Sequence, residues 1–274
     1  MLPDSLVALP DLISQPVLGF LADNIFHPPS STPETANPYM TVILRWIHVL
    51  AGIIWIGHLY FFNLVNVNLM KALDGPTKGK VIPQLMPRAL WWFRWGAALT
   101  VLVGLMYYAM YILPPDVRNA RASGENANTW IILLVWLLII IIIFAIGMFA
   151  MKSVNNGWLL AVIIGLLALA LAVIAACWLE SQLDDKGSTN TYSIGIGGGL
   201  GIWMMLNVWG IIWPNQKRII GWTANNAEKG TAIPAESAKL ARVAFLASRT
   251  NTWLSIPMLF FMVAAGNHFP GWIG

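Results

Sequence analysis

Two histidines of this sequence lie in long apolar stretches and have the chemistry of haem ligands. His48 falls about seven residues into the first apolar stretch, and His268 ends the last one. Histidine inside a membrane is costly and is by default a functional residue. A six-coordinate haem b needs two neutral imidazoles from separate helices, with its flat macrocycle between them. The sequence therefore predicts that His48 and His268 bind one haem iron between the first and last spans.

Small residues lie beside both histidines, on the helix face that each histidine would present to the haem. They are Ala51 and Gly52 after His48, and Ala264 and Ala265 before His268. Residues three and four positions apart share a helix face, so each histidine has an open patch beside it that a macrocycle would need. Small residues beside a polar one are equally typical of ordinary helix packing, in which histidine hydrogen-bonds a neighbouring helix. Both interpretations stay open.

Two further residues of the first span belong to the predicted haem site. Arg45 lies one turn outward from His48, where its guanidinium would pair with a propionate near the membrane surface. Trp55 lies two turns inward and would pack on the edge of the macrocycle. Together with the small residues, they make up the predicted binding site.

The other histidines fit that site less well. His58 follows His48 by ten residues, which places it about 15 Å deeper and about 80° around the helix. It cannot share a haem with His48, and no transmembrane histidine at its depth completes a second site, so we interpret it as a packed residue or a single ligand. His27 lies in a proline-rich linker, where a solvated surface residue is expected.

The elements that position these residues are membrane spans. Hydrophobic residues make up 58% of the 274 residues and charged residues 10%, whereas soluble globular chains carry about 25% charged residues. We therefore expect an all-α integral membrane protein, a bundle of about six transmembrane helices, and exclude a cytosolic enzyme, a disordered chain and a nucleic-acid binder. A crossing takes about 20 residues. The predicted spans are residues 41–67, 89–113, 129–151, 157–179, 192–213 and 252–268.

Two other segments complete the predicted organisation. Residues 1–40 form an N-terminal interfacial segment followed by a Pro-rich linker, and residues 41–274 form the six-helix domain. Between the fifth and sixth spans, residues 234–248 are predicted to form an amphipathic helix, with lysine and arginine on one side.

The charges predict the orientation of the spans. Of the 16 lysines and arginines, only four fall on the side that holds both termini, while nine of the 12 acidic residues fall there. The positive-inside rule then puts both termini outside. An acidic outer face would steer a basic soluble partner, although acidic loops also simply translocate easily.

Two patterns are excluded as cofactor motifs. The glycine run from Gly195 to Gly201 lies in a membrane span without a βαβ context and does not fit the dinucleotide pattern, so its GxxxG pairs indicate close helix packing. The single cysteine, Cys177, rules out an internal disulfide and a covalent c-type haem.

Several separated motifs resemble the membrane domain of the bacterial membrane-bound urate oxidase (urate hydroxylase) family. The resemblance spans about residues 41–270. The motifs are Arg45-Trp46-x-His48-x-x-Ala51-Gly52-x-x-Trp55-x-Gly57, Trp213-Pro214-Asn215-Gln216, Ser248-Arg249-Thr250-Asn251-Thr252 with Ser255-Ile256-Pro257, and Asn267-His268-Phe269-Pro270.

The resemblance implies a redox protein of the bacterial inner membrane, with periplasmic termini. In that family a C-terminal cytochrome c domain accepts the electrons, and this sequence has no Cys-x-x-Cys-His motif. We therefore expect a separate c-type cytochrome on the outer face, or a role as a subunit of a respiratory complex. Urate oxidation with an external cytochrome c and a cofactor-free structural subunit are the alternatives. His48 and Trp55-x-Gly57 are also similar to the first span of small membrane-type protoporphyrinogen oxidases.

Overall fold

A computed structural model describes residues 38–265, and within this range the chain is helical, with no β-strand. The chain divides into two compact units, residues 1–44 and 45–274. Of the first unit only residues 38–44 are described, and they begin the first helix. The all-α prediction is confirmed.

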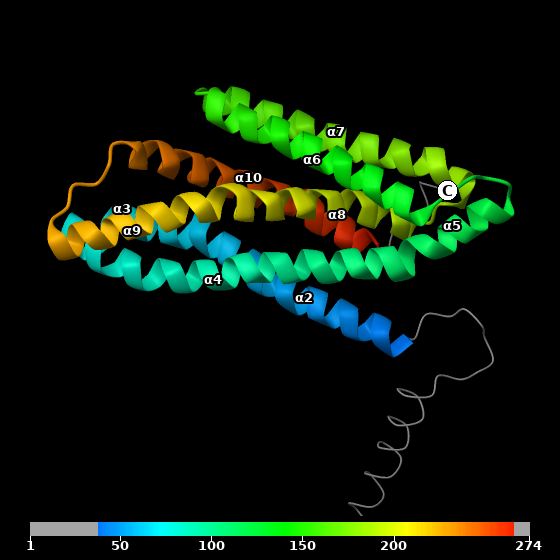
Figure 1. The fold of residues 1–274 in the computed structure, drawn as a ribbon, viewed down its shortest axis with the longest axis horizontal. Helices are drawn as coiled ribbons and strands as arrows, with labels where there is room; N and C mark the ends of the chain where they lie inside the picture. The colour runs from blue at the N-terminus through cyan, green and yellow to red at the C-terminus, as the bar shows by residue number, and fades with distance from the viewer. Residues whose placement is uncertain (1–37, 266–274) are drawn as a thin grey trace, which may run out of the picture. The chain divides into compact units, whose positions relative to one another are not determined.

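The helices follow one another with short connections (Figure 1). The α-helices are α2 (Pro38–Tyr60), α3 (Val67–Ala72), α4 (Gly75–Tyr107), α5 (Leu113–Ala122), α6 (Thr129–Ser153), α7 (Gly157–Leu183), α8 (Thr189–Asn207), α9 (Trp213–Lys229) and α10 (Glu236–Ala264). Three wider π-helical segments, η2 (Phe61–Asn66), η3 (Tyr108–Ile112) and η5 (Val208–Ile212), join consecutive α-helices without a break, and a 3₁₀ turn, η4 (Asp184–Lys186), follows α7.

Within residues 38–265, five continuous helices are long and apolar enough to cross a membrane. They are Tyr39–Ala72, Gly75–Ala122, Thr129–Ser153, Gly157–Lys186 and Thr189–Lys229, and they contain the first five predicted spans. Of the sixth predicted span, residues 252–264 belong to α10, while residues 266–268 lie outside the described part of the chain.

Side-chain caps start the helices of the second half of the bundle. Asn128 accepts hydrogen bonds from the backbone N–H groups of the first turn of α6, and Asn156 does the same for α7. Ser188 accepts the N–H of Thr191 at the start of α8. These caps satisfy donors that a helix leaves free at its N-terminus. The connection between α6 and α7 is only three residues long, which makes the two helices antiparallel neighbours.

Helix α8 lies at the centre of the second unit and packs against α4, α6, α7 and α10. A Cβ added at Gly197 would lie 2.9 Å from Cβ of Phe261 and 3.2 Å from the carbonyl oxygen of Met258, both on α10. A Cβ at Gly199 would meet Ile140 of α6 at 3.6 Å. The glycine run therefore permits close helix packing, as its spacing predicts.

Two of the π-helical segments precede prolines. Pro114 and Pro115 follow η3, and Pro214 follows η5. Proline lacks an N–H group, and its ring clashes with the carbonyl group four residues earlier in a regular α-helix. A π-helical turn directly before the proline interrupts that regular pattern. The helix consequently continues beyond residue 213, where the predicted fifth span ends.

The C-terminal region differs from the prediction in one respect. The helix predicted over residues 234–248 is present from Glu236, but it is continuous with the last predicted span, because residues 236–264 form the single helix α10. Thr250 and Asn251 in the middle of this helix are buried, and Asn251 bonds α8 through its amide. These contacts keep the helix continuous.

Candidate functional site

A cavity of about 560 Å³ lies among the helices of the second unit. Its lining residues come from α2, from α4 and η3, from α6, from α8 and from α10 with Ala265 that follows it. On α8 the lining runs from Asn190 to Ile202, which corresponds to about 18 Å along the helix axis. The volume is within the range of about 300–1,000 Å³ that is typical of ligand pockets. The cavity can therefore hold a flat or elongated ligand.

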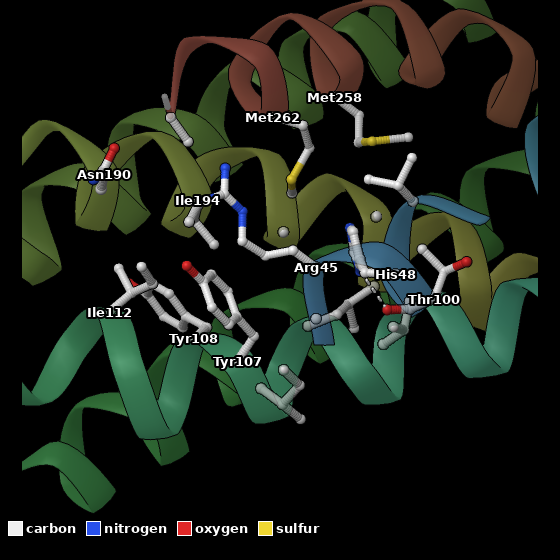
Figure 2. A pocket seen from close by; sticks show the side chains of 18 of the residues that line it. Arg45, His48, Thr100, Tyr107, Tyr108, Ile112, Asn190, Ile194, Met258 and Met262 are labelled. Atoms are coloured by element: carbon white, nitrogen blue, oxygen red, sulfur yellow. Dashed lines mark hydrogen bonds between the residues drawn. The ribbon is translucent and has the colours of Figure 1, made fainter. Parts of the chain in front are cut away.

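His48 is fixed in the wall of this cavity by a contact between helices. Its Nδ1 lies 2.8 Å from the backbone carbonyl oxygen of Thr100 on α4 (Figure 2). A carbonyl oxygen only accepts hydrogen bonds, so Nδ1 carries the proton and donates it. In the neutral imidazole, Nε2 then has a free lone pair. Histidine ligands of metals usually have this arrangement, in which the second ring nitrogen donates to a carbonyl group or a carboxylate.

Gly104 makes room for the imidazole. A Cβ added at Gly104 would lie 2.7 Å from Cε1 of His48 and 2.8 Å from its Nδ1. Both distances are shorter than van der Waals contact, so a side chain at this position would displace the ring. Helix α4 therefore positions His48 in two ways. The carbonyl group of Thr100 accepts a hydrogen bond from its Nδ1, and the lack of a side chain at Gly104 leaves space for its ring.

Aromatic residues form another part of the wall. The hydroxyl of Tyr108 donates to the carbonyl oxygen of Thr191 at 3.1 Å, and Nε1 of Trp136 donates to that of Gly195 at 2.9 Å. The two rings also contact each other, with centroids 5.6 Å apart. Since their donors are used by the backbone of α8, these residues contribute rigid ring surface to the cavity.

A few polar groups in the lining have unused capacity for hydrogen bonds. Nε1 of Trp55 and Oδ1 of Asn190 are buried and have no hydrogen-bond partner among residues 38–265. Arg45 also lines the cavity, one turn of helix from His48. Buried polar groups are nearly always hydrogen-bonded to protein, water or ligand. These three side chains offer a ligand both donors and an acceptor.

Two methionines of α10 line the same cavity. Figure 2 shows the side chains of Met258 and Met262 extending from α10 into the region that also holds His48 and Arg45. Their thioether sulfurs are weak acceptors and soft metal ligands. Within residues 38–265 no cluster of three or more histidine, cysteine or acidic side chains could hold a metal ion.

Comparison with known families now adds to this geometry. Residues 75–274 match the family model described as urate oxidase N-terminal, and this is more than two thirds of the chain. The chain belongs to the urate oxidase N-terminal family. The family resemblance expected from the motifs is therefore confirmed. Comparisons with curated proteins and with solved structures find no match.

The match to the urate oxidase N-terminal family includes most of the cavity wall. It covers α4, η3, α6, α8 and α10, and begins after α2. The wall from α2, with Arg45, His48 and Trp55, lies outside the matched residues. The carbonyl group of Thr100 and the gap at Gly104, which position His48, lie inside them.

The structure brings several of the predicted site residues together. Arg45, His48, Trp55 and Ala265 all line the cavity. Ala51, Gly52 and Ala264 are not part of its lining. A Cβ at Gly52 would face Cγ2 of Thr100 at 3.8 Å, and Ala51 and Ala264 are buried in helix contacts. In the described residues, the small side chains next to His48 serve the packing of α2 on α4.

The remaining histidines do not line the cavity or are not described. His58 donates from Nδ1 to the carbonyl oxygen of Ile54 in its own helix, at 2.7 Å, and lies beside the ring of Phe62. His268, the predicted partner of His48, lies outside the described residues, as does His27. The pairing of His48 with His268 stays a prediction.

Sequence reasoning did not identify the residues that α4, α8 and α10 contribute. Thr100 contributes its backbone carbonyl group, and Gly104 contributes space because it has no side chain. The type of residue at these two positions therefore does not indicate a role in the site. Met262 had a weak signal as a polarizable residue in an apolar stretch, whereas Asn190 lies in a polar stretch before the predicted fifth span and had none. Only the packing of the helices shows that all four adjoin one cavity.

Proposed function

We propose that this protein is a membrane redox protein that binds haem b in the cavity at His48 and exchanges electrons with a c-type cytochrome. The observation that carries the proposal is the hydrogen bond made by the imidazole of His48. Its Nδ1 is committed to the carbonyl group of Thr100, so the Nε2 lone pair is available to a metal in the cavity. Membership of the urate oxidase N-terminal family and the five membrane-spanning helices support a membrane redox protein in general.

The residues of the cavity fit this cofactor. Gly198 and Gly201 of α8 give a wall without side chains, and Tyr107 and Tyr108 add aromatic surface for a flat macrocycle. Arg45 would pair with a propionate through charge-assisted hydrogen bonds, and the unpartnered Nε1 of Trp55 offers a further donor. When bound, haem b supplies one-electron chemistry, and His48 would hold its iron.

The proposed partner is favoured by the charge at one end of the bundle. The connections next to α5, α7 and α8 carry exposed carboxylates. They are Glu125, Asp184 and Asp185, and Glu180 in the last turn of α7 is exposed at the same end. Cys-x-x-Cys-His is absent from the sequence, so a c-type haem would come from another protein or domain. A soluble cytochrome with a basic surface would be attracted to such an acidic end. By the positive-inside rule this end faces outward, toward the periplasm.

A pyridine haemochrome assay and a reduced-minus-oxidised spectrum of the purified protein test the proposal. We expect haem b in the wild type and its loss in His48→Ala. His58→Ala is the matched control, because His58 lies on the same helix and also donates from Nδ1 to a carbonyl group, but does not line the cavity. A wild type without haem, or His48→Ala with full haem content, would overturn it.

Urate oxidation in the same cavity is the second candidate, and Asn190 favours it. Urate is a planar molecule with N–H donors and carbonyl acceptors. The unpartnered Oδ1 of Asn190 would accept an N–H group, and Arg45 would donate to a carbonyl group or to the urate anion. Hydroxylation of urate by water releases two electrons and two protons. Two molecules of ferric cytochrome c would accept the electrons, and water would take up the protons.

Reduction of added ferric cytochrome c by urate tests this second function. We expect urate-dependent reduction by the wild type and a KM for urate raised about tenfold or more in Asn190→Leu, because a substrate N–H group would lose a buried acceptor. Asn68→Leu, an exposed asparagine on α3, is the control. No turnover with an acceptor present would exclude urate as the substrate while leaving the haem proposal unaffected.

A further inference from the structure

We infer that the thioether of Met262 is the second axial ligand of the iron that His48 holds. This inference rests on the proposed haem site and names a residue of this chain that would complete it. Three observations support it: the depth of Met262 relative to His48, the close approach of α10 to the cavity, and the free lone pair of His48.

The contacts between helices place Met262 at the depth of His48. Helices α4 and α8 run antiparallel, with the hydroxyl of Tyr108 on the carbonyl group of Thr191. One turn before Tyr108 is Gly104, the residue that the His48 ring contacts. One turn beyond Thr191 on α8 is Gly195, and Gly197 lies two residues, about 3 Å, further along the helix. Cε of Met262 lies 3.2 Å from the position of a Cβ on Gly197.

Glycines of α8 bring α10 toward the cavity. A Cβ at Gly197 would clash with Cβ of Phe261 at 2.9 Å, and one at Gly201 would contact Cγ of Met258 at 3.9 Å. Small residues let helix backbones approach closely in membranes. The side chain of Met262 consequently enters the cavity from α10, while His48 enters it from α2 (Figure 2).

Met262 is the better candidate of the two methionines on this face. Figure 2 shows its side chain extending away from α10 into the cavity, toward the region of Arg45 and His48, whereas that of Met258 bends along the helix. Met258 is also buried, with 6% of its surface exposed, and is held in the contact with Gly201. Met258 is therefore the weaker candidate for a ligand.

The chemistry of a histidine–methionine pair suits the proposed partner. A thioether is a neutral, soft ligand that favours the reduced iron and raises its reduction potential relative to two histidines. A haem with such ligands would be poised nearer to a c-type cytochrome, which often has the same ligand pair. His268, the ligand expected from the sequence, follows Met262 by six residues in the sequence and lies outside the described residues.

The test uses purified, haem-containing protein with four single substitutions. Met262→Leu is expected to keep its haem on His48, to lose the low-spin spectrum, and to bind carbon monoxide in the reduced state, which the wild type does not. Met106→Leu, at an exposed methionine of α4 that does not line the cavity, and His268→Ala are expected to keep the wild-type spectrum and potential. Met262→His is expected to restore a low-spin spectrum at a lower reduction potential than the wild type.

Opposite results would overturn the inference. If Met262→Leu keeps the wild-type spectrum and potential, Met262 is not a ligand. If His268→Ala instead gains carbon monoxide binding, the second ligand is His268. Should Met262→Leu fail to assemble, Met262→His decides the question, because an unchanged potential in that variant contradicts ligation. A wild type that contains no haem would refute the proposed function itself, which is a different outcome from each of these.

Discussion

The helix formed by α2 and η2 has two halves that treat their polar residues differently. In the cavity half, residues 45–55, the side chains of Arg45, His48 and Trp55 line a cavity, and Nε2 of His48 and Nε1 of Trp55 have bonding capacity that the described residues do not use. In the packed half, residues 58–66, His58 bonds its own helix, and Tyr60 and Asn63 bond Ser255 and Ser248 of α10. The difference indicates that polar residues in this membrane bundle are of two kinds, those that hold helices together and those left for a ligand.

The hydrogen bonds of the two histidines make the comparison specific. Both donate from Nδ1 to a backbone carbonyl group, at 2.8 Å for His48 and 2.7 Å for His58. The acceptor of His48 lies on another helix, whereas that of His58 is four residues earlier in its own helix. Only His48 is therefore positioned by tertiary structure, which is what a ligand of a fixed cofactor requires.

The largest expected effect comes from filling the space beside His48. Gly104→Val would place side-chain atoms within the imidazole, since even a Cβ would lie 2.7 Å from Cε1. We expect complete loss of haem, measured by the pyridine haemochrome assay on purified protein. Gly57→Val is the control. Gly57 lies between the two halves of the helix, and nothing lies within 4 Å of a Cβ at this position. Equal haem contents in Gly104→Val and Gly57→Val would contradict the assignment of haem binding to the cavity half.

The next effect concerns the approach of α10 to α8. Gly197→Ala puts a Cβ 2.9 Å from Phe261 and 3.2 Å from the backbone of Met258, so we expect a loss of about 1–3 kcal/mol in the free energy of unfolding, the usual cost of overpacking. Gly201→Ala has ordinary contact distance and should cost much less. Unfolding of the detergent-solubilised protein by denaturant measures both. A smaller loss for Gly197→Ala than for Gly201→Ala would contradict the packing described for α10.

A smaller effect is expected in the packed half. Asn63→Leu removes the 2.8 Å hydrogen bond to Ser248 and should lower the free energy of unfolding by about 1 kcal/mol, as interhelical hydrogen bonds in membranes typically do. Haem content should not change, because Asn63 does not line the cavity. Asn68→Leu, whose side chain is exposed, controls for the substitution itself. Loss of haem in Asn63→Leu would mean that the two halves are not independent.

Much of the fold could be predicted from the sequence, and less of the site. Length and apolarity suffice to locate a membrane helix, and the run of isoleucines in α6 has no other explanation. The glycines of α8 likewise predict close packing by their spacing. Continuity of α10 was missed, since buried contacts of Asn251 override the polar sequence around it. For the site, histidine in an apolar stretch identified His48, but no residue pattern reveals that Thr100 contributes a carbonyl group or that Gly104 contributes space.

The smallest effect concerns the acidic end of the bundle and the proposed cytochrome partner. Glu125→Gln combined with Asp184→Asn removes two exposed carboxylates from that end. We expect the bimolecular rate of electron exchange with a basic c-type cytochrome to fall about threefold at low salt, because long-range attraction speeds association. The difference should vanish at about 0.5 M salt, where screening shortens the range of the attraction. Glu228→Gln, an exposed carboxylate on α9, should have no effect if the cavity half of the helix faces the acceptor. An equal fall in the electron-exchange rate for Glu228→Gln would mean that the cytochrome binds elsewhere. The cavity half would then have no electron acceptor at its end of the bundle.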